Sequence, residues 1–433
     1  MPERNNSKPR RPGKPLRVGL IGVTGYALAY FEELSELVRR GLVEWGAVTI
    51  INREESAEQL EILQREKVPV YSNYQDMIES EAGRLDWVCV PTAIGWHARM
   101  TVDCLARGLP VLLEKPVAPT LQDVAAIQAA ENESGLPVAI GYQHSYSRST
   151  WEIKELLMEG TIGRISRVDC IGLWPRGHSY YSRNYWSGRV HAGEFWVLDS
   201  PFHNALAHLA NLMLFLAGTS LGGRADPVRV MAELYRSKPI QNFDTIWTRA
   251  TLDSGAEANV ILSHSSLDTI DPEIRLTGSK GVMIWRFNGG HTLDAGGNVR
   301  TFPVEEQVPV RTNMFNSVVR LLQGDTSVRY CSTEQAKGEV KWINAAQDCI
   351  RVHDVPDDFR RQFVDQSGEA FDIIENFEVF ATRAYRDGCS FHEAGAPWAV
   401  EPGTIETSDY NEFRADMIEA PFPPLEASVQ TRG

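Results

Sequence analysis

Short, unbroken apolar runs alternate with amphipathic segments along the first part of the chain. The runs are LRVGLIGV (16–23), AVTII (47–51), VPVY (68–71), LDWVCVP (85–91), PVLLE (110–114) and PVAIGY (137–142). The segments between them carry apolar residues at helical spacing. Apolar strands without alternation are typical of a parallel sheet that helices cover on both faces. We therefore predict an α/β domain with a doubly wound parallel sheet over residues 16–142.

From about residue 143, apolar positions alternate with polar ones, as in strands that have one buried face. Glycine turns separate these runs and helical segments are few, which predicts an open, mostly antiparallel sheet. We assign residues 143–350 to an α+β domain for substrate binding and oligomerisation, with a cofactor cleft between the two domains. The runs are RISRVDCIGLW (164–174), PVRVMAELYR (227–236), FDTIWTRATLD (243–253), AEANVILSHSS (256–266), PEIRLTGSKG (272–281) and GVMIWRF (281–287).

Both ends of the chain differ from the two domains. Residues 1–15 are basic and polar, and we predict that they form a disordered tail. The segments DDFRRQF (357–363) and GEAFDIIENFEVFATRAYRDG (368–388) predict a helical extension within residues 351–433. The Pro-rich end of that region predicts a loose tail.

Composition excludes several classes of partner. The chain has 433 residues and a net charge of −14, which argues against nucleic acid or an anionic membrane surface as a partner. No apolar run reaches membrane-spanning length. Six cysteines are scattered without the spacing of a metal site, which favours reduced thiols and a cytoplasmic location. Arg10 and Arg11 resemble an export signal, but no small-residue cleavage site follows them.

The first strand-to-helix turn, in VGLIGVTGYALAY, is the candidate phosphate site. A dinucleotide fingerprint reads GxGxxG, and Gly22 fits its first glycine. Thr24 stands at the second glycine and Ala27 at the third, where alanine is acceptable. Gly25, followed by Tyr26, can restore the close backbone approach that Thr24 hinders. The alternative is a tight turn of another α/β fold, but a strand before and a helix after favour a Rossmann domain that binds a dinucleotide.

The end of the second strand bears on the choice of cofactor. An acidic residue there would bind the ribose 2′-hydroxyl of NAD. This chain has Asn52 at that place and Arg53 after it, and an arginine can pair with a 2′-phosphate. We predict NAD(P) as the cofactor and favour NADP; in the alternative, Arg53 is only a solvated surface residue.

Lys115 follows the buried run VLL directly, between Glu114 and Pro116. Ligands of an open parallel sheet lie outside the carboxyl ends of its strands. The ammonium of Lys115 would therefore lie where a nicotinamide ring and a substrate meet. The alternative is an ordinary surface lysine in a loop.

At these motifs the chain resembles the glucose–fructose oxidoreductase/inositol dehydrogenase family, Gfo/Idh/MocA. The resemblance rests on VGLIGVTG, on VPTAIGWHARMTVDCLARGLPVLLEKP and on AIGYQHSYSRSTWEIKELLMEGTIGRI, and it covers about residues 16–350. It implies NAD(P)-dependent oxidation or reduction of a sugar, a polyol or a similar compound. It further implies that Lys115 is catalytic and close to the cofactor, and that Glu114 lies under the nicotinamide.

The resemblance also implies further cofactor contacts. Pro91, Thr92 and His97 occupy the family's dinucleotide-contacting loop. After the last strand, Gln143 is a candidate cofactor contact. There, where family members often carry arginines, this chain has His144 and Ser145.

The stretch VLDSPFHNALAHLANLMLFLAG (197–218) contains the candidate catalytic histidine. The family pattern is Asp-x-Gly-x-His-x-x-Asp, with a glycine ten residues past the histidine. Counting back from Gly218 implies His208 as this histidine, with Asn204 and Asn211 in the two aspartate positions. His203, four residues after Asp199, is the rival by local spacing.

Chemistry assigns a role to each of these residues. His208 would accept a proton from the substrate alcohol as hydride leaves its carbon, and Lys115 would stabilise the developing alkoxide. On a helix that begins near Asn204, residues 204, 208 and 211 would share a face, so Asn204 could orient or replace a proton-handling group. The alternative for His208 is a helix-face histidine with a satisfied hydrogen bond.

The loop WPRGHSYYSRNYWSGR (174–189) is rich in aromatic rings and forked donors, which recognise sugar rings and carboxylates. We predict that it binds substrate together with Lys115, Asn204 and His208. Alternatively, the loop folds on its own aromatics or contacts another subunit. The candidate residues are Arg176, Tyr181, Arg183 and Trp186.

Two classes of function compete at this point. The first is a pyridine-nucleotide oxidoreductase, in which the cofactor is exchanged or is tightly bound and recycled. The second is a non-catalytic dinucleotide-binding sensor or scaffold, which the missing glycine and the two asparagines would suit. Lys115 and His208 favour the enzyme. The resemblance further suggests a homodimer or homotetramer formed through an exposed face of the second-domain sheet.

Overall fold

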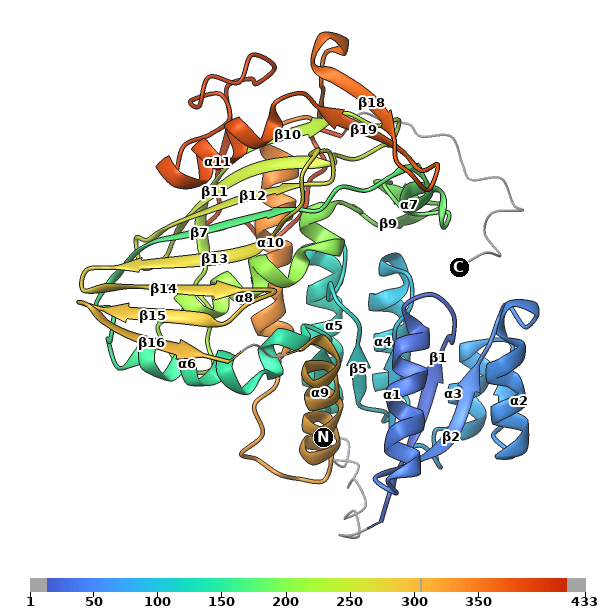
Figure 1. Cartoon of the computed structure of the whole chain (residues 1–433). Helices are drawn as coiled ribbons and strands as arrows, with labels where there is room; N and C mark the ends of the chain where they lie inside the picture. Colours follow the sequence, from blue (N-terminus) through green and yellow to red (C-terminus); the bar gives the residue numbers. More distant parts are fainter. Residues whose placement is uncertain (1–13, 304–305, 419–433) are drawn as a thin grey trace.

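A computed structural model describes residues 14–303 and 306–418, and two sheets organise this part of the chain (Figure 1). Most of the predicted basic tail and residues 419–433 of the predicted loose tail lie outside the described residues. None of the described helices has the length and apolar character that a membrane crossing requires.

The first domain is a six-stranded parallel sheet in the order β3-β2-β1-β4-β5-β6. Its strands are β1 (Leu16–Ile21), β2 (Val43–Thr49), β3 (Val70–Tyr71), β4 (Trp87–Val90), β5 (Val111–Leu113) and β6 (Val138–Ile140). Its helices are α1 (Ala27–Arg39), α2 (Ala57–Arg65), α3 (Tyr74–Glu81), α4 (His97–Ala106) and α5 (Leu121–Ser134). The strand order reverses between β1 and β4, where a doubly wound sheet opens its ligand crevice. The predicted Rossmann fold is confirmed.

The second domain is a ten-stranded sheet in the order β16-β15-β14-β13-β7-β12-β11-β10-β17, with β20 also paired to β10. Its strands are β7 (Ile165–Leu173), β10 (Pro227–Arg236), β11 (Thr245–Leu252), β12 (Glu257–Ser263), β13 (Ile270–Gly278), β14 (Gly281–Arg286), β15 (His291–Ala295), β16 (Asn298–Phe302), β17 (His353–Asp354) and β20 (Gly403–Glu406). All pairs are antiparallel except β7–β12 and β10–β17. The mostly antiparallel sheet is therefore confirmed, although β15 and β16 were not predicted.

Helices after the second sheet return to the first domain (Figure 1). In α9 (Gln307–Leu322), the ring of Phe315 packs 5.0 Å from that of Tyr30. Helix α10 (Thr333–Cys349) contacts both domains. On one side, Trp342 Nε1 donates to Thr248 Oγ1 of β11 at 2.9 Å; on the other, Asn344 accepts the N–H of Leu121 at 3.0 Å. Two more helices, α6 (Arg148–Met158) and the almost entirely buried α8 (Ala207–Ala217), complete this side of the sheet.

The C-terminal extension corrects one prediction. Residues 357–363 and 368–374 were predicted to be helical, but β18 (Arg360–Val364) and β19 (Ala370–Ile374) form an antiparallel hairpin there. The carboxylate of Asp365 accepts N–H groups across the turn, and Gly368 adopts a φ of +86°. The rings of Phe363 and Phe371 stack across the two strands at 5.0 Å, which favours the hairpin. The helical prediction holds only for α11 (Phe377–Asp387).

The same extension covers the outer face of the second-domain sheet. Because side chains alternate along a strand, β7, β10, β11 and β12 bury a second set of apolar residues on the face turned away from α8 and α10. The face that was expected to be exposed for a partner subunit is thus occupied over these four strands. The contacts join Ile171, Tyr235, Trp247 and Ile261 of the sheet to Phe377, Phe391 and Trp398 of the extension.

Candidate active site

The glycine turn after β1 has the geometry of an anion-binding turn. Gly22 and Gly25 have φ angles of +92° and +59°, a left-handed conformation that a Cβ atom disfavours. In the described part of the chain, the N–H groups of Thr24, Gly25 and Tyr26 donate to no backbone carbonyl. Helix α1 begins directly afterwards, so its dipole adds to these free donors. The turn therefore suits a pyrophosphate.

Asn52 and Arg53 lie just past the carboxyl end of β2. The carbonyl of Asn52 accepts the hydroxyl of Ser56 at 2.9 Å, which shapes the loop. Arg53 is exposed, and among the described residues its guanidinium makes a single long hydrogen bond, 3.5 Å from Nη2 to the carbonyl oxygen of Val70. Its guanidinium is therefore free to turn toward a ligand at this edge.

Glu114 is buried behind the turn that carries Lys115. Its Oε2 accepts the hydroxyl of Tyr30 at 2.7 Å, while its Oε1 has no hydrogen-bond partner among the described residues. Burial raises the pKa of Glu114 to about 7, against the opposing charge of Lys115. Beside it, the hydroxyl of Tyr26 donates to Oε1 of Gln143 at 3.4 Å and so links the glycine turn to the residues after β6.

We expect Gly141→Ala to destabilise the fold by about 1 to 3 kcal/mol, the usual range for overpacking. A Cβ atom at position 141 would lie 2.5 Å from Oε2 of Glu114 and 2.9 Å from the hydroxyl of Tyr30. Gly83→Ala is the matched control, because a Cβ atom there meets nothing within 4 Å, and its effect should stay within about 0.5 kcal/mol. Denaturant unfolding compares the two variants, and equal stabilities would contradict the packing described for Glu114.

Lys115 bonds to a residue of the second domain. Its Nζ donates to the backbone carbonyl of Asn204 at 2.8 Å and to Oδ1 of the same residue at 3.1 Å. Nδ2 of Asn204 in turn donates to Oδ1 of Asp199 at 2.7 Å. Burial lowers the pKa of Lys115, while the charges of Glu114 and Asp199 oppose that shift. A hydrogen-bonded chain of Lys115, Asn204 and Asp199 therefore joins the domains.

The backbone around Asn204 corrects the predicted helix. Residues 204, 208 and 211 do not lie on one continuous α-helix, because Pro201–Ala205 forms a π-helical turn and α8 begins only at Ala207. Such turns are frequent at functional sites. Just before it, the buried Leu198 has a φ of +51°, a conformation that costs energy for a residue with a side chain. Asn211 lies deeper in the protein and donates to Oγ of Ser145 at 3.2 Å.

His208 is the second residue of α8 and is half-buried. Its ring lies 5.6 Å from the ring of Tyr142 and 5.4 Å from that of His144, and its Nδ1 is buried without a hydrogen-bond partner among the described residues. Burial, followed by the charge of Lys115 and by His144, holds the pKa of His208 well below its usual range. His208 is therefore neutral at pH 7.

The rival histidine, His203, is packed inside the protein. It is fully buried, and its Nδ1 lies 2.9 Å from Oε1 of Glu339 on α10. The other oxygen of Glu339 accepts the hydroxyl of Tyr142 at 3.1 Å. Local contacts thus fix His203 in a buried network, while His208 keeps some exposure.

His97 lies beneath the loop that carries Lys115. Its Nδ1 is 2.7 Å from the carbonyl oxygen of Pro116 and its Nε2 is 3.0 Å from that of Thr92. Burial lowers the pKa of His97 to about 4, so the ring is neutral. A neutral imidazole carries one N–H, which can donate to one of these two carbonyl oxygens. This arrangement gives His97 a positioning role. A direct contact of Pro91, Thr92 or His97 with a dinucleotide stays a prediction.

The residues predicted to bind substrate lie in the loop 174–189, which includes the short helix α7 (His178–Ser182). Arginine side chains and aromatic rings alternate along this loop. The guanidinium carbon of Arg183 lies 3.5 Å from the ring centroid of Tyr180, and that of Arg176 lies 5.1 Å from the same centroid. Arg183 also lies 5.8 Å from the ring centroid of Trp186. The arginines of this loop therefore stack on its aromatic rings.

A cavity of about 820 Å³ borders this loop. Tyr181 and Gly188 are among the residues that line it. The hydroxyl of Tyr181 lies 2.8 Å from Nδ1 of the buried His264, and the N–H of Gly188 donates to Oδ2 of Asp199 at 2.5 Å. Asp199 also holds Asn204, so the cavity wall connects to the Lys115 chain.

Three buried residues that shape the site, Tyr30, Tyr142 and Glu339, were not found from the sequence. Tyr30 lies on the inner face of α1, but tyrosine at an inward position is ordinary core. Glu339 lies 136 residues after its partner His203, and no spacing along the chain connects the two. The sequence offered one signal for Glu339, which is that a glutamate stands at an apolar position of a helix.

Comparison with known proteins identifies both domains. Residues 16–142 match the family model described as the oxidoreductase family with an NAD-binding Rossmann fold, and residues 150–284 match the GFO/IDH/MocA C-terminal domain. Inositol 2-dehydrogenase of Serratia proteamaculans is 25% identical over 227 residues, which are 49% of this chain and 66% of that protein. The rhizopine catabolism protein MocA of Rhizobium meliloti is 27% identical over 154 residues, 36% of this chain and 46% of that protein. The matches thus span less than two thirds of these relatives.

Solved structures share the fold. An inositol dehydrogenase homolog from Azotobacter vinelandii, complexed with NADH and myo-inositol, has a TM-score of 0.62 at 18% identity, over 76% of this chain and 94% of that one. The WlbA dehydrogenase from Bordetella pertussis, in complex with NADH and UDP-GlcNAcA, has a TM-score of 0.62 at 19% identity, over 76% and 94%. The chain belongs to the GFO/IDH/MocA oxidoreductase family and carries that family's NAD-binding Rossmann domain.

Proposed function

We propose that the chain is an NAD(P)-dependent dehydrogenase or reductase that acts on the CH–OH group of a sugar, a polyol or a related alcohol, or on the corresponding ketone. One observation carries the proposal: Lys115, at the carboxyl end of β5, donates to Asn204 from the second domain. The names of the inositol 2-dehydrogenase and MocA relatives support the same class of substrate.

The first domain suits a nicotinamide dinucleotide. The turn from Gly22 to Tyr26 offers free N–H groups to a pyrophosphate, and the unpartnered oxygen of Glu114 offers an acceptor near Lys115. We assign the pyrophosphate to this turn and the nicotinamide to the neighbourhood of Glu114 and Lys115, with Gln143 nearby. When bound, the nicotinamide gives or receives the hydride.

The chain's own residues handle the oxygen and the proton of the substrate. Two N–H bonds of the Lys115 ammonium are directed at Asn204, and the third is left to hold the substrate oxygen and stabilise its negative charge. Neutral His208 accepts the hydroxyl proton, or returns it in the reverse direction. Asn204, fixed by Asp199, keeps the ammonium in place.

The preference for NADP rests on Arg53. We expect Arg53→Ala to weaken NADP binding by about tenfold or more, because it removes a charge-assisted contact with the 2′-phosphate, and to leave NAD binding unchanged. Titration of both nucleotides measures the ratio. An unchanged ratio would contradict this role and leave NAD, the cofactor named for the family, as the choice.

Purification followed by absorbance and mass analysis of bound nucleotide tests the proposed function. A panel of sugars and polyols, including myo-inositol, is then scored for reduced cofactor. Nucleotide that stays bound and is reduced in place would identify the variant of this function in which the cofactor is recycled. Nucleotide binding with no turnover of any sugar, polyol or ketone would contradict the oxidoreductase and favour the sensor.

A further inference from the structure

Cations and aromatic rings alternate along the loop 174–189. The guanidinium of Arg176 lies near the rings of Trp174 and Tyr180. The guanidinium of Arg183 lies near the rings of Tyr180 and Trp186, so the two arginines share Tyr180. The distances to the ring centroids are 5.6 and 5.1 Å for Arg176, and 3.5 and 5.8 Å for Arg183. Stacking of this kind orients a guanidinium while its N–H groups stay available.

These arginines lack carboxylate partners. In the part of the chain that the structure describes, neither Arg176, Arg183 nor Arg189 forms an ion pair, and Nε of Arg176 is buried without any hydrogen bond. Other arginines of the same sheet do form ion pairs with carboxylates: Arg167 with Asp169, Arg236 with Asp354 and Arg286 with Glu273. Arg176 and Arg183 are thus held by aromatic rings and not by a direct ion pair.

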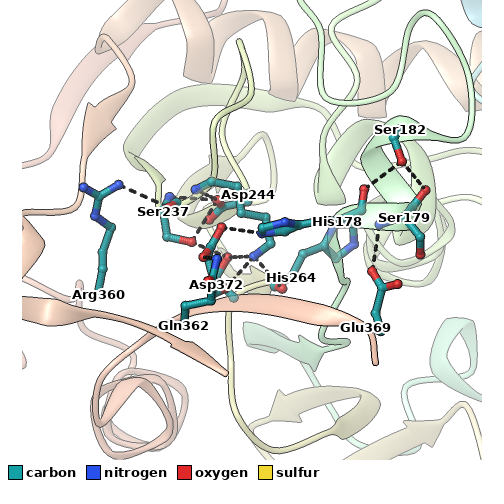
Figure 2. Close-up of polar contacts among 12 residues, drawn as sticks. His178, Ser179, Ser182, Ser237, Asp244, His264, Arg360, Gln362, Glu369 and Asp372 are labelled. Atoms are coloured by element: carbon teal, nitrogen blue, oxygen red, sulfur yellow. Dashed lines mark hydrogen bonds and ion pairs between the residues drawn. The ribbon is translucent and has the colours of Figure 1, made fainter. Parts of the chain in front are cut away.

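The carboxylates nearby are already occupied. Asp199 accepts the N–H of Gly188 and the amide of Asn204. Asp372, on β19, lies 2.8 Å from Nε2 of His178 and accepts from Gln362 at 3.0 Å (Figure 2). Neither carboxylate bonds directly to an arginine of the loop, although Asp199 lies close enough to Arg183 for their charges to attract.

The cavity of about 820 Å³ beside this loop collects the positive charge. Arg183 and Arg189 line it, together with the buried Lys238. The ammonium of Lys238 donates only to uncharged oxygens, at 3.0 Å to the carbonyl of His264, at 2.5 Å to Oγ of Ser265 and at 2.8 Å to the carbonyl of Asp372. Burial lowers the pKa of Lys238, and the nearby charges of Asp244 and Asp372 oppose that shift without bonding to the ammonium directly.

The hairpin of the C-terminal extension holds the cavity wall in place. Figure 2 shows His178 against Asp372 and the backbone of Ser179 against Glu369, which it meets at 2.7 Å. Both contacts tie α7 to the hairpin, and α7 carries the cavity residues His178 and Tyr181. The subsite is thus built before a ligand arrives, which limits the ordering cost of binding.

We propose that this cavity is an anion subsite, and that the substrate carries a carboxylate or a phosphate group at the end remote from the reacting hydroxyl. The inference rests on the proposed function and narrows its substrate to an acidic or phosphorylated sugar or polyol. Planar guanidinium groups match both oxyanions. The volume suits a sugar-sized ligand, and Tyr181 and Tyr185 offer rings to its body.

Binding to the full-length protein saturated with NADPH or NADH tests the proposal, because the nucleotide then occupies the pyrophosphate turn. Calorimetry compares D-glucuronate, D-glucose 6-phosphate and D-glucose, a matched set with a carboxylate, a phosphate and no charge. We expect at least one anion to bind about tenfold or more tightly than glucose. The anion that binds identifies the group that the subsite takes.

The double variant Arg183→Gln/Arg189→Gln should abolish this preference while nucleotide affinity stays unchanged. Arg351→Gln, which removes an exposed charge after α10, is the control and should keep the preference. If glucose binds as well as both anions, if neither anion binds, or if the preference survives in the double variant, the anion subsite is wrong. Bound nucleotide and turnover of neutral polyols are scored separately, so these results leave the proposed oxidoreductase standing.

Discussion

Replacing Lys115 with alanine is expected to lower turnover by at least about a hundredfold, with nucleotide affinity changed much less. The ammonium is held by Asn204 from the opposite domain, and its loss removes the group that would stabilise the substrate's developing negative charge. Steady-state kinetics with the alcohol that the panel identifies measures the loss, and nucleotide titration supplies the second readout. A variant that turns over normally would remove Lys115 from the mechanism.

His208→Ala should lose activity to a similar extent, because it removes the proton acceptor. Since the two groups act on one hydroxyl, the double variant should be little worse than the worse single variant. His203→Ala is the control for the choice of histidine, with rates expressed per folded protein. If His203→Ala abolishes turnover while His208→Ala stays active, the count from Gly218 selected the wrong residue.

The largest effect on stability is expected for Glu339→Ala, at about 3 to 5 kcal/mol of unfolding free energy. The carboxylate is fully buried and serves both Nδ1 of His203 and the hydroxyl of Tyr142, so its removal leaves two buried polar groups unpaired. Denaturant unfolding measures the loss.

Glu334→Ala is the matched control, because it removes the same side chain from the same helix. Glu334 is largely exposed and pairs with Arg224, so its loss should cost about 0 to 1 kcal/mol. Equal destabilisation by the two variants would contradict the buried network around His203.

Sequence reasoning succeeded where local pattern and structure agree. Strands β1, β4 and β5 are mostly apolar because other elements cover both of their faces. Their own residues are therefore enough to predict them as buried strands. The position of Lys115 followed from the rule that parallel strands present ligands at their carboxyl ends. The bond between Lys115 and Asn204 depends on a π-helical turn that no local pattern predicted.

The failures have a common physical cause. Residues 357–374 carry charged residues between apolar ones, which suits either a helix or a hairpin, and the stacking of Phe363 on Phe371 decides for the hairpin. The stacking of Arg176 and Arg183 on Trp174, Tyr180 and Trp186 depends on how the loop 174–189 folds, which no local pattern gives. Both outcomes depend on tertiary contacts, which override local preference.

Helix α10 connects the two domains. It donates from Trp342 into the second sheet, and Asn344 bonds to the loop before α5 in the first domain through both its oxygen and its nitrogen. One helix bonded to both halves couples them mechanically, so the two halves should gain or lose their structure together.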